Sequence, residues 1–417
     1  MSSADTPWSV QLGLAAALGA IGAGSALAFV AVVSAGERLL WPDPIDPDWF
    51  SGSIRILVIM TVAGSIVGLI HSLVAAEEEN VFEALGTGKL ALRPVPGAVA
   101  IALVTLVGGF SLGPEVPTGM AAGGMAGWLA SRRKLSSEES ELATRSAITG
   151  AWGGLFTAPF TAVLLNIELG FDKRVIGWTR LSMDATAAMV GFAIFFAVTA
   201  SWSDVLSLVD LAPYEFRLRH VAMAAGLGVL GAVMGTLFKL LTLGTRRLAA
   251  PFAGHPIVRG TFAGVVLGLV GMALPLTLFL GTEGLVDVTD DPESLGAGLI
   301  LTSVAIKLLA TSGALSFGFV GGPVFPLLFA GGGLGAAINV LVPGVPLALA
   351  VTALMAAVPA SVIPVPLSLA TLTILIAGVG ATEVTAVFVA AVVGLIAGRL
   401  IETALRRDPS SPAPAVS

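Results

Sequence analysis

Residues 110–119 read FSLGPEVPTG and place one carboxylate inside strongly apolar sequence. Arg93 is the last basic residue before the stretch and Arg132 is the next one after it. Between them Glu115 is the only charged residue. Glycine and proline break the apolar run on both sides of Glu115. The explanation for this lone carboxylate depends on its surroundings.

The composition indicates a membrane. The chain has 417 residues, of which 56% are hydrophobic and 12% charged, and its mean hydropathy is +0.95. Soluble globular chains carry about 25% charged residues, so this chain lacks the polar surface of a soluble protein. Several apolar runs exceed the ~20 residues that a helix needs to cross a bilayer, and others are shorter and broken. The runs cover roughly 9–35, 54–76, 96–112, 146–167, 184–201, 221–244, 259–281, 296–310, 327–341, 347–380 and 385–400.

We therefore predict an all-α polytopic membrane protein in the cell inner membrane or plasma membrane. One transmembrane domain is expected to fill residues 1–417, with a short disordered tail at 408–417 and no soluble regulatory domain. Basic residues such as Arg132, Arg133 and Lys134 predict a cytoplasmic loop, and the basic C-terminal end is expected on the same side. The expected surroundings are lipid, with no nucleic acid.

The residue types indicate neither a cofactor site nor an enzyme active site. The chain has no cysteine, and His71, His220 and His255 are scattered without ligand spacing, so neither a metal site nor another cofactor is expected. No nucleophile and base cluster within the apolar runs, so we do not expect an enzyme.

Two pairs of similar segments indicate an internal duplication. Residues 113–127 (GPEVPTGMAAGGMAG) resemble 322–336 (GPVFPLLFAGGGLGA), which lie 209 positions later. Residues 158–165 (APFTAVLL) resemble 365–372 (VPLSLATL), 207 positions later. Broken segments at matching places in two halves are typical of transporters and mark their binding sites. We predict repeats over about 10–205 and 220–400.

The first pair of segments also predicts the chemistry of the site. Proline is favoured in the first helical turn, so Pro117 and Pro326 are expected to begin helices. A helix N-terminus attracts anions through its partial charge and its unpaired N–H groups. Glu115 beside such an N-terminus would occupy an anion site until it is protonated or displaced. The alternative is that Glu115 is only a helix cap.

Three motifs in order carry a family resemblance. LGPEVPT at 112–118 is similar to a G-[K/R]-E-G-P motif, and FTAPFTAVLLNIE at 156–168 is similar to FNAPLAGxLFxxE. SFGFVGGPVFP at 316–326 is similar to a GxFxP region and is preceded by Lys307 and Thr311. Together they resemble the chloride channel (CLC) family of anion channels and anion/proton exchangers over roughly residues 10–400. Within that family the chain is most similar to a bacterial subgroup of candidate ion-transport proteins that also carries SLGPE.

The resemblance implies an inverted-repeat helical bundle with broken helices, assembled as a homodimer in which each subunit has its own pore. It implies transport of a small inorganic anion such as chloride, with Glu115 as the gate. The implied anion-binding residues lie in the two Gly/Pro loops: Gly113, Pro114, Glu115, Val116, Gly322, Pro323, Val324 and Phe325.

The chain also departs from the family pattern. The family's GSGIPE motif should fall near 75–80, where the chain reads AAEEEN, and the coordinating Tyr has no counterpart because Tyr214 is the only tyrosine. Val324 stands where the family has Phe. Leu169 stands where exchangers carry a second Glu that relays protons. This pattern favours a channel or a weakly proton-coupled transporter. The alternatives are a chloride, fluoride or nitrate antiporter with another internal relay, and a non-transporting membrane protein.

Three other groups of residues are secondary. Glu168 fits a structural role as well as a functional one, and Lys307 and Leu169 are further candidates near the motifs. Glu77, Glu78 and Glu79 are expected at a solvated helix end, with an ion vestibule as the alternative.

Overall fold

The computed structural model describes residues 7–42, 45, 48, 50–74, 81–170, 177–199 and 209–407. Within these ranges the chain is helical and contains no strand, which confirms the all-α prediction. Glu77 to Glu79, Lys173, Arg174 and the tail 408–417 lie outside the described residues. The helices are α1 (Trp8–Leu40), α2 (Ile54–Leu73), α3 (Val81–Thr87), α4 (Val95–Val107), α5 (Glu115–Arg132), α6 (Ser137–Leu155), α7 (Pro159–Gly170), α8 (Trp178–Thr199), α9 (Leu218–Ala249), α10 (Pro256–Ala273), α11 (Thr282–Asp290), α12 (Pro292–Ser316), α13 (Val324–Leu341), α14 (Leu347–Val362), α15 (Pro366–Ile376) and α16 (Val384–Arg407).

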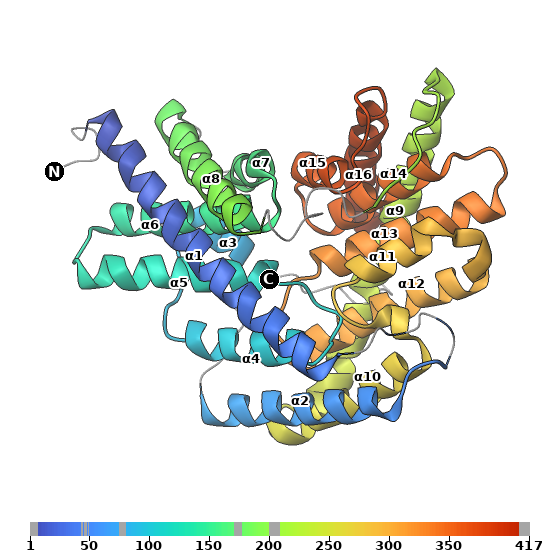
Figure 1. Ribbon diagram of the computed structural model, residues 1–417, viewed down its shortest axis with the longest axis horizontal. Helices are drawn as coiled ribbons and strands as arrows, with labels where there is room; N and C mark the ends of the chain where they lie inside the picture. Colours follow the sequence, from blue (N-terminus) through green and yellow to red (C-terminus); the bar gives the residue numbers. More distant parts are fainter. Residues whose placement is uncertain are drawn as a thin grey trace.

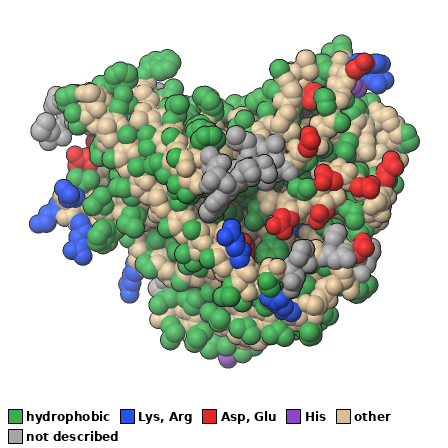
Figure 2. Space-filling model, in the orientation of Figure 1, with side chains coloured by type: hydrophobic (Ala, Val, Ile, Leu, Met, Phe, Trp, Pro, Cys, Tyr) green, Lys and Arg blue, Asp and Glu red, His purple; other side chains and the backbone are tan. Residues whose placement is uncertain are grey.

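Many of these helices suit a bilayer. In the described part of the chain, eight are long and apolar enough to cross a membrane, and α4, α7, α14 and α15 are shorter apolar helices. Figure 2 shows hydrophobic side chains over much of one face, with basic side chains at the edge near α5 and α6. A surface of this kind is suited to lipid rather than to water.

The two halves of the chain repeat one packing scheme. In the first half α1 packs on α6 and α8, and α5 packs on α6. In the second half α9 packs on α14 and α16, and α13 packs on α14. Figure 1 shows the halves side by side, with α2 of one half lying along α10 of the other. The fold is therefore the expected bundle of two repeats, whereas their limits near 205 and 220 stay a prediction.

Glycines allow the helices of the first half to approach closely. A Cβ atom on Gly22 would lie 1.9 Å from the carbonyl oxygen of Ala147, and one on Gly191 would lie 1.9 Å from that of Gly150. Small residues at such crossings let backbones approach within the bilayer, where packing rather than the hydrophobic effect holds helices together. These contacts fix α6, which carries several residues of the site.

Two of the apolar runs each contain parts of two helices. The run 146–167 contains the end of α6 and most of α7, and the run 347–380 contains α14 and α15. The second helix of each pair begins at a proline, Pro159 or Pro366. Proline removes a backbone donor and disfavours helical geometry in the residue before it, so it ends the preceding helix. Hydropathy alone does not detect these breaks.

Candidate functional site

The two Gly/Pro loops that the sequence paired meet inside the bundle. The N–H of Gly113 donates to the carbonyl oxygen of Gly322 at 2.7 Å, and the N–H of Gly322 donates to that of Gly113 at 2.8 Å. This antiparallel bridge joins loops that are 209 residues apart in sequence. It brings together the N-termini of α5 and α13.

Both helices begin earlier than predicted. α5 begins at Glu115 and α13 at Val324, so Pro117 and Pro326 are each the third helical residue rather than the first. Pro114 and Pro323 occupy the positions just before the helices. The first four N–H groups of a helix have no partner within it, so proline at the third position costs no hydrogen bond. The consequence is that Glu115 lies in the first turn of its own helix.

The carboxylate of Glu115 crosses from one helix to the other. Its side chain is fully buried, and its Oε1 accepts the backbone N–H of Val324 at 2.8 Å. Its Oε2 has no hydrogen-bond partner among the described residues. The carbonyl oxygen of Glu115 accepts the indole N–H of Trp152 at 2.8 Å, which ties the residue to α6. One carboxylate oxygen is thus held by the N-terminus of α13, and the other has no partner in the part of the chain that the structure describes.

Glycine is needed on both sides of this carboxylate. A Cβ atom on Gly113 would lie 2.0 Å from Glu115 Oε2, and one on Gly322 would lie 1.9 Å from Glu115 Oε1. Any side chain at either position would push the carboxylate out of its place. The glycines therefore shape a cradle for a small anionic group, which Glu115 fills.

The other predicted anion-binding residues surround this cradle. Val116 and Val324 are buried in the first turns of α5 and α13, and the ring of Phe325 lies 6.1 Å from that of Phe156. Pro114 and Pro323 precede the two helices. The structure gathers the whole set in one place, and its binding of an anion stays a prediction.

A cavity leads from the surface toward these loops. Its outer part has a volume of ≈ 600 Å³, and a narrower part of ≈ 110 Å³ extends to Pro114. Glu37 and Phe279 line both parts. Glu283 and Asp287 add acidic groups to the outer part. Burial raises the pKa of Asp287, and the nearby carboxylate of Glu283 raises it further. Sequence reasoning missed this approach, because its walls come from α1 and from the segment around α11.

Glu168 lies at a different helix N-terminus. Its Oε1 accepts the N–H of Leu367 at 2.8 Å, and its Oε2 accepts the N–H of Ser368 at 2.9 Å and also the Ser368 hydroxyl. The residue therefore links α7 to α15. Leu169 next to it packs against the hydrophobic core and offers no titratable group.

Lys307 is fully buried on α12, away from the Glu115 hydrogen bonds. Its ammonium group donates to the carbonyl oxygens of Leu278 at 2.9 Å and Phe279 at 3.1 Å and lies 4.8 Å from the centre of the Phe329 ring. It holds the segment that forms a wall of the outer cavity. Lys307 thus acts on that segment rather than on the carboxylate of Glu115.

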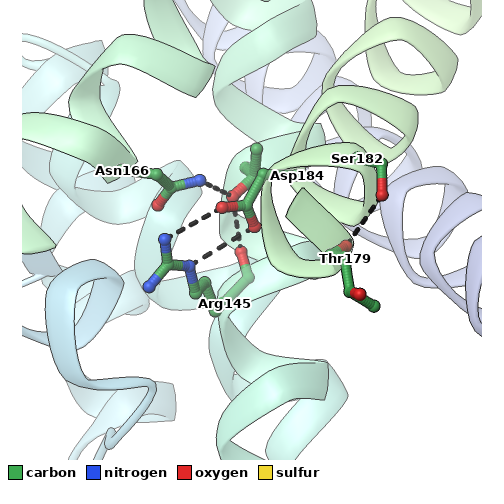
Figure 3. Close-up of polar contacts among 6 residues, drawn as sticks. Arg145, Asn166, Thr179, Ser182 and Asp184 are labelled. Carbon is green, nitrogen blue, oxygen red and sulfur yellow. Dashed lines mark hydrogen bonds and ion pairs between the residues drawn. The ribbon is translucent and has the colours of Figure 1, made fainter. Parts of the chain in front are cut away.

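A buried ion pair in the first half was not foreseen. Figure 3 shows Arg145 of α6 and Asp184 of α8 facing each other, at 2.9 Å from Nη2 to Oδ2 and 3.3 Å from Nε to Oδ1. Thr149, one turn along α6, accepts the side-chain amide of Asn166 at 2.7 Å. Arg145, Thr149 and Trp152 share one face of α6, so this polar group lies on the same face as the indole that holds Glu115. The two ions are 39 residues apart in sequence, and no local pattern pairs them.

Comparison with known proteins decides the family. Residues 63–399 match the protein family described as voltage gated chloride channel. The chain belongs to this family. It is 29% identical over 350 residues to the "Putative ion-transport protein YfeO" of Salmonella schwarzengrund and equally to that of Salmonella newport, covering 78% of this chain and 80% of each relative.

Solved structures agree on the fold. A slow cyanobacterial Cl⁻/H⁺ antiporter superposes with a TM-score of 0.78 at 18% identity, covering 95% of both chains. A CLC-type fluoride/proton antiporter superposes with a TM-score of 0.70 at 17% identity, covering 93% of this chain and 94% of the other. Membership of the voltage-gated chloride channel family makes the chain a multi-pass membrane protein of an anion-transport family, and its bacterial relatives fit an inner-membrane location.

Proposed function

We propose that this chloride channel family member moves chloride or a similar small anion through a pore gated by Glu115, in a channel-like or weakly proton-coupled way. The observation that carries the proposal is the fully buried Glu115 carboxylate, which accepts the N–H of Val324 at 2.8 Å and whose other oxygen has no partner among the described residues. A helix N-terminus that holds a carboxylate can hold an inorganic anion instead. Protonation of Glu115 removes its charge and frees the site.

We infer the weak coupling of anion and proton movement from Leu169. Leu169 packs in the core at the position where the resemblance expects a proton-relaying Glu. A hydrocarbon side chain carries no proton. We therefore expect anions to pass with little stoichiometric proton movement. We also expect a homodimer, as in the family, with a pore in each subunit.

Flux from proteoliposomes tests the proposal. Vesicles loaded with chloride would be diluted into an impermeant-anion buffer, with valinomycin to clamp the voltage and with or without a proton-shunting ionophore. We expect chloride efflux at the same rate in both conditions. Failure to release chloride at any pH from well-folded protein would overturn chloride as the transported anion, and failure with fluoride and nitrate as well would overturn the pore.

A proton-coupled antiporter is the second candidate, and the buried Asp184 favours it. Asp184 is a carboxylate on the same side of α6 as the tie to Glu115, and only Arg145 pairs with it in the described part of the chain. An imposed chloride gradient that drives protons uphill at a fixed ratio would establish this candidate. Asp184→Asn should then abolish the uphill proton movement and leave chloride efflux. Under the channel proposal the wild type shows no such proton movement, and Asp184→Asn leaves chloride efflux unchanged.

A further inference from the structure

A second cavity adjoins Phe317, the residue that follows α12. It has a volume of ≈ 180 Å³ and lies between α2, α10 and the end of α12, with His71, Arg259 and Phe317 on its walls. A water molecule takes a share of ~30 Å³ in the liquid, so the cavity has room for several groups of that size. Neither Glu115 nor its partners line it.

Arg259 is a cation without an acid in the described residues. Its Nη2 donates to the carbonyl oxygen of Ser316 at 2.7 Å, and it forms no ion pair with any described carboxylate. Its Nε is buried and has no hydrogen-bond partner there. The Arg259 side chain as a whole is half-buried, but its Nε is enclosed. Buried donors are nearly always hydrogen-bonded, so this Nε calls for an acceptor in the cavity, and the positive charge of the guanidinium favours an anionic one.

His71 faces the same point from α2. Its Nε2 lies 2.7 Å from the carbonyl oxygen of Gly318, which can only accept, so Nε2 carries the proton. A Cβ atom on Gly318 would lie 3.1 Å from both the Nη2 of Arg259 and the Nε2 of His71. The two basic side chains therefore converge on one glycine. No acidic side chain lines this cavity among the described residues, and the N-terminus of α10, at Pro256, adds its partial positive charge.

We propose that this cavity binds one small inorganic anion, of the halide type, as the counter-ion of Arg259. The site is separate from the Glu115 cradle but belongs to the same loop, because Ser316 and Gly318 lead directly to Gly322. The proposal rests on the proposed function only for the class of anion present, since binding here does not require transport.

Bromide binding to the purified full-length protein tests the site. Calorimetric titration of bromide into protein in sodium gluconate should show one more bound ion per chain in the wild type than in Arg259→Gln. Arg259→Lys keeps the charge but loses the fork of donors, so we expect it to bind this ion about 10- to 100-fold more weakly. Arg246→Gln removes an exposed cation that does not line the cavity, and it should bind as the wild type does.

Three results would overturn the proposal. The first is an unchanged bromide stoichiometry in a folded Arg259→Gln protein, which would mean that water alone satisfies the donor. The second is loss of the extra bromide in nanodiscs with phosphatidylglycerol but not with phosphatidylcholine, which would mean that the headgroup of an anionic lipid occupies the site. The third is the absence of an anomalous bromide peak between Arg259 and His71 in crystals grown in bromide.

Glu115→Gln separates this proposal from the proposed function. It should leave the Arg259 bromide site in place, because Glu115 does not line that cavity. A wild-type flux profile in Glu115→Gln together with an intact Arg259 site would refute the gate and support the second site.

Discussion

Glu115 and Glu168 make the same kind of contact but accept different numbers of hydrogen bonds among the described residues. Each is a carboxylate of the first half that accepts backbone N–H groups at the N-terminus of a second-half helix, α13 or α15. Glu168 uses both oxygens in three hydrogen bonds, including one from the Ser368 hydroxyl. Within the described part of the chain, Glu115 accepts one hydrogen bond, from Val324, and its other oxygen has no partner.

The difference indicates which carboxylate can leave. A group held by three donors loses all of them when it moves, whereas Glu115 gives up one hydrogen bond and relieves an unsatisfied buried oxygen. Glu115 is also enclosed by Gly113 and Gly322, which leave a cradle when it departs. We infer that Glu168 fastens the two halves together and that Glu115 is the movable group.

The largest expected effect is that of removing the Glu115 charge. Glu115→Gln and Glu115→Ala should conduct chloride at neutral pH about 10- to 100-fold faster than the wild type, because the competing carboxylate and its charge-assisted hydrogen bond are gone. Both should lose most of the acid activation expected of the wild type. Chloride efflux from proteoliposomes across a pH series measures this.

The cap-only reading of Glu115 makes the opposite prediction. A lost cap would destabilise the protein by about 0.5–2 kcal/mol and leave the pH profile of the flux intact. An unchanged pH profile in a well-folded Glu115→Gln protein would therefore rule out the gate. Glu168→Gln is the matched control, since it removes a carboxylate from the other helix N-terminus.

The second prediction displaces the Glu115 carboxylate without removing it. The Cβ atom of Gly322→Ala would lie 1.9 Å from Glu115 Oε1, so the carboxylate has to leave Val324. Chloride efflux at neutral pH should rise, up to the level of Glu115→Gln and with some response to acid retained. Gly226→Ala is the control, because nothing lies within 4 Å of a Cβ atom there. Equal efflux in the two alanine variants would contradict the cradle.

The third prediction concerns the fastening role of Glu168. Glu168→Gln loses charge-assisted hydrogen bonds between α7 and α15, and we expect a loss of about 1.5–3 kcal/mol of unfolding free energy. Thermal unfolding in detergent measures it. The pH profile of the chloride flux should stay as in the wild type. A variant of normal stability with an altered pH profile would make Glu168 a second gate and end the contrast with Glu115.

Much of this comparison could be predicted from the sequence. The Gly/Pro motifs and their repeat at 322–326 predicted helices that begin near Pro117 and Pro326, because each motif is a local break before a helix. The bridge between Gly113 and Gly322 was not itself predicted. The starts of α5 and α13 were misplaced by two residues because proline is tolerated throughout the first turn. The sequence left the role of Glu168 open between structural and functional. Its hydrogen-bond partners are about 200 residues away, so the neighbouring sequence does not reveal them.

Long-range polar pairs explain the rest of what was missed. Arg145 with Asp184, and Arg259 with the carbonyl oxygen of Ser316, join residues whose neighbours in sequence are apolar or small. Hydropathy predicts the helices that carry these residues, but it does not predict which faces of the helices pack against each other. The motif resemblance located the cradle around Glu115. His71 and Arg259, which line the second cavity, belong to none of the motifs.

The smallest expected effect belongs to a third carboxylate at a helix N-terminus, Glu139, which extends the comparison to an exposed site. Glu139 accepts the N–H and the hydroxyl of Ser136, both at 2.9 Å, in a capping box at the start of α6. The Ser136 N–H, and then its hydroxyl, lower the pKa of Glu139 from its usual 4.5. A lowered pKa in the folded state means that the cap stabilises the fold above the unfolded-state pKa and is lost as the pH falls through the folded-state pKa.

Because Glu139 is exposed and water screens its charge, Glu139→Gln should lower the unfolding temperature at neutral pH by less than Glu168→Gln does. The difference from the wild type should vanish in acid below the folded-state pKa, where Glu139 is itself neutral. Thermal unfolding at both pH values measures this, with chloride flux expected to be unchanged. A larger loss than in Glu168→Gln would mean that burial is not what separates a carboxylate that fastens two halves from one that only caps a helix.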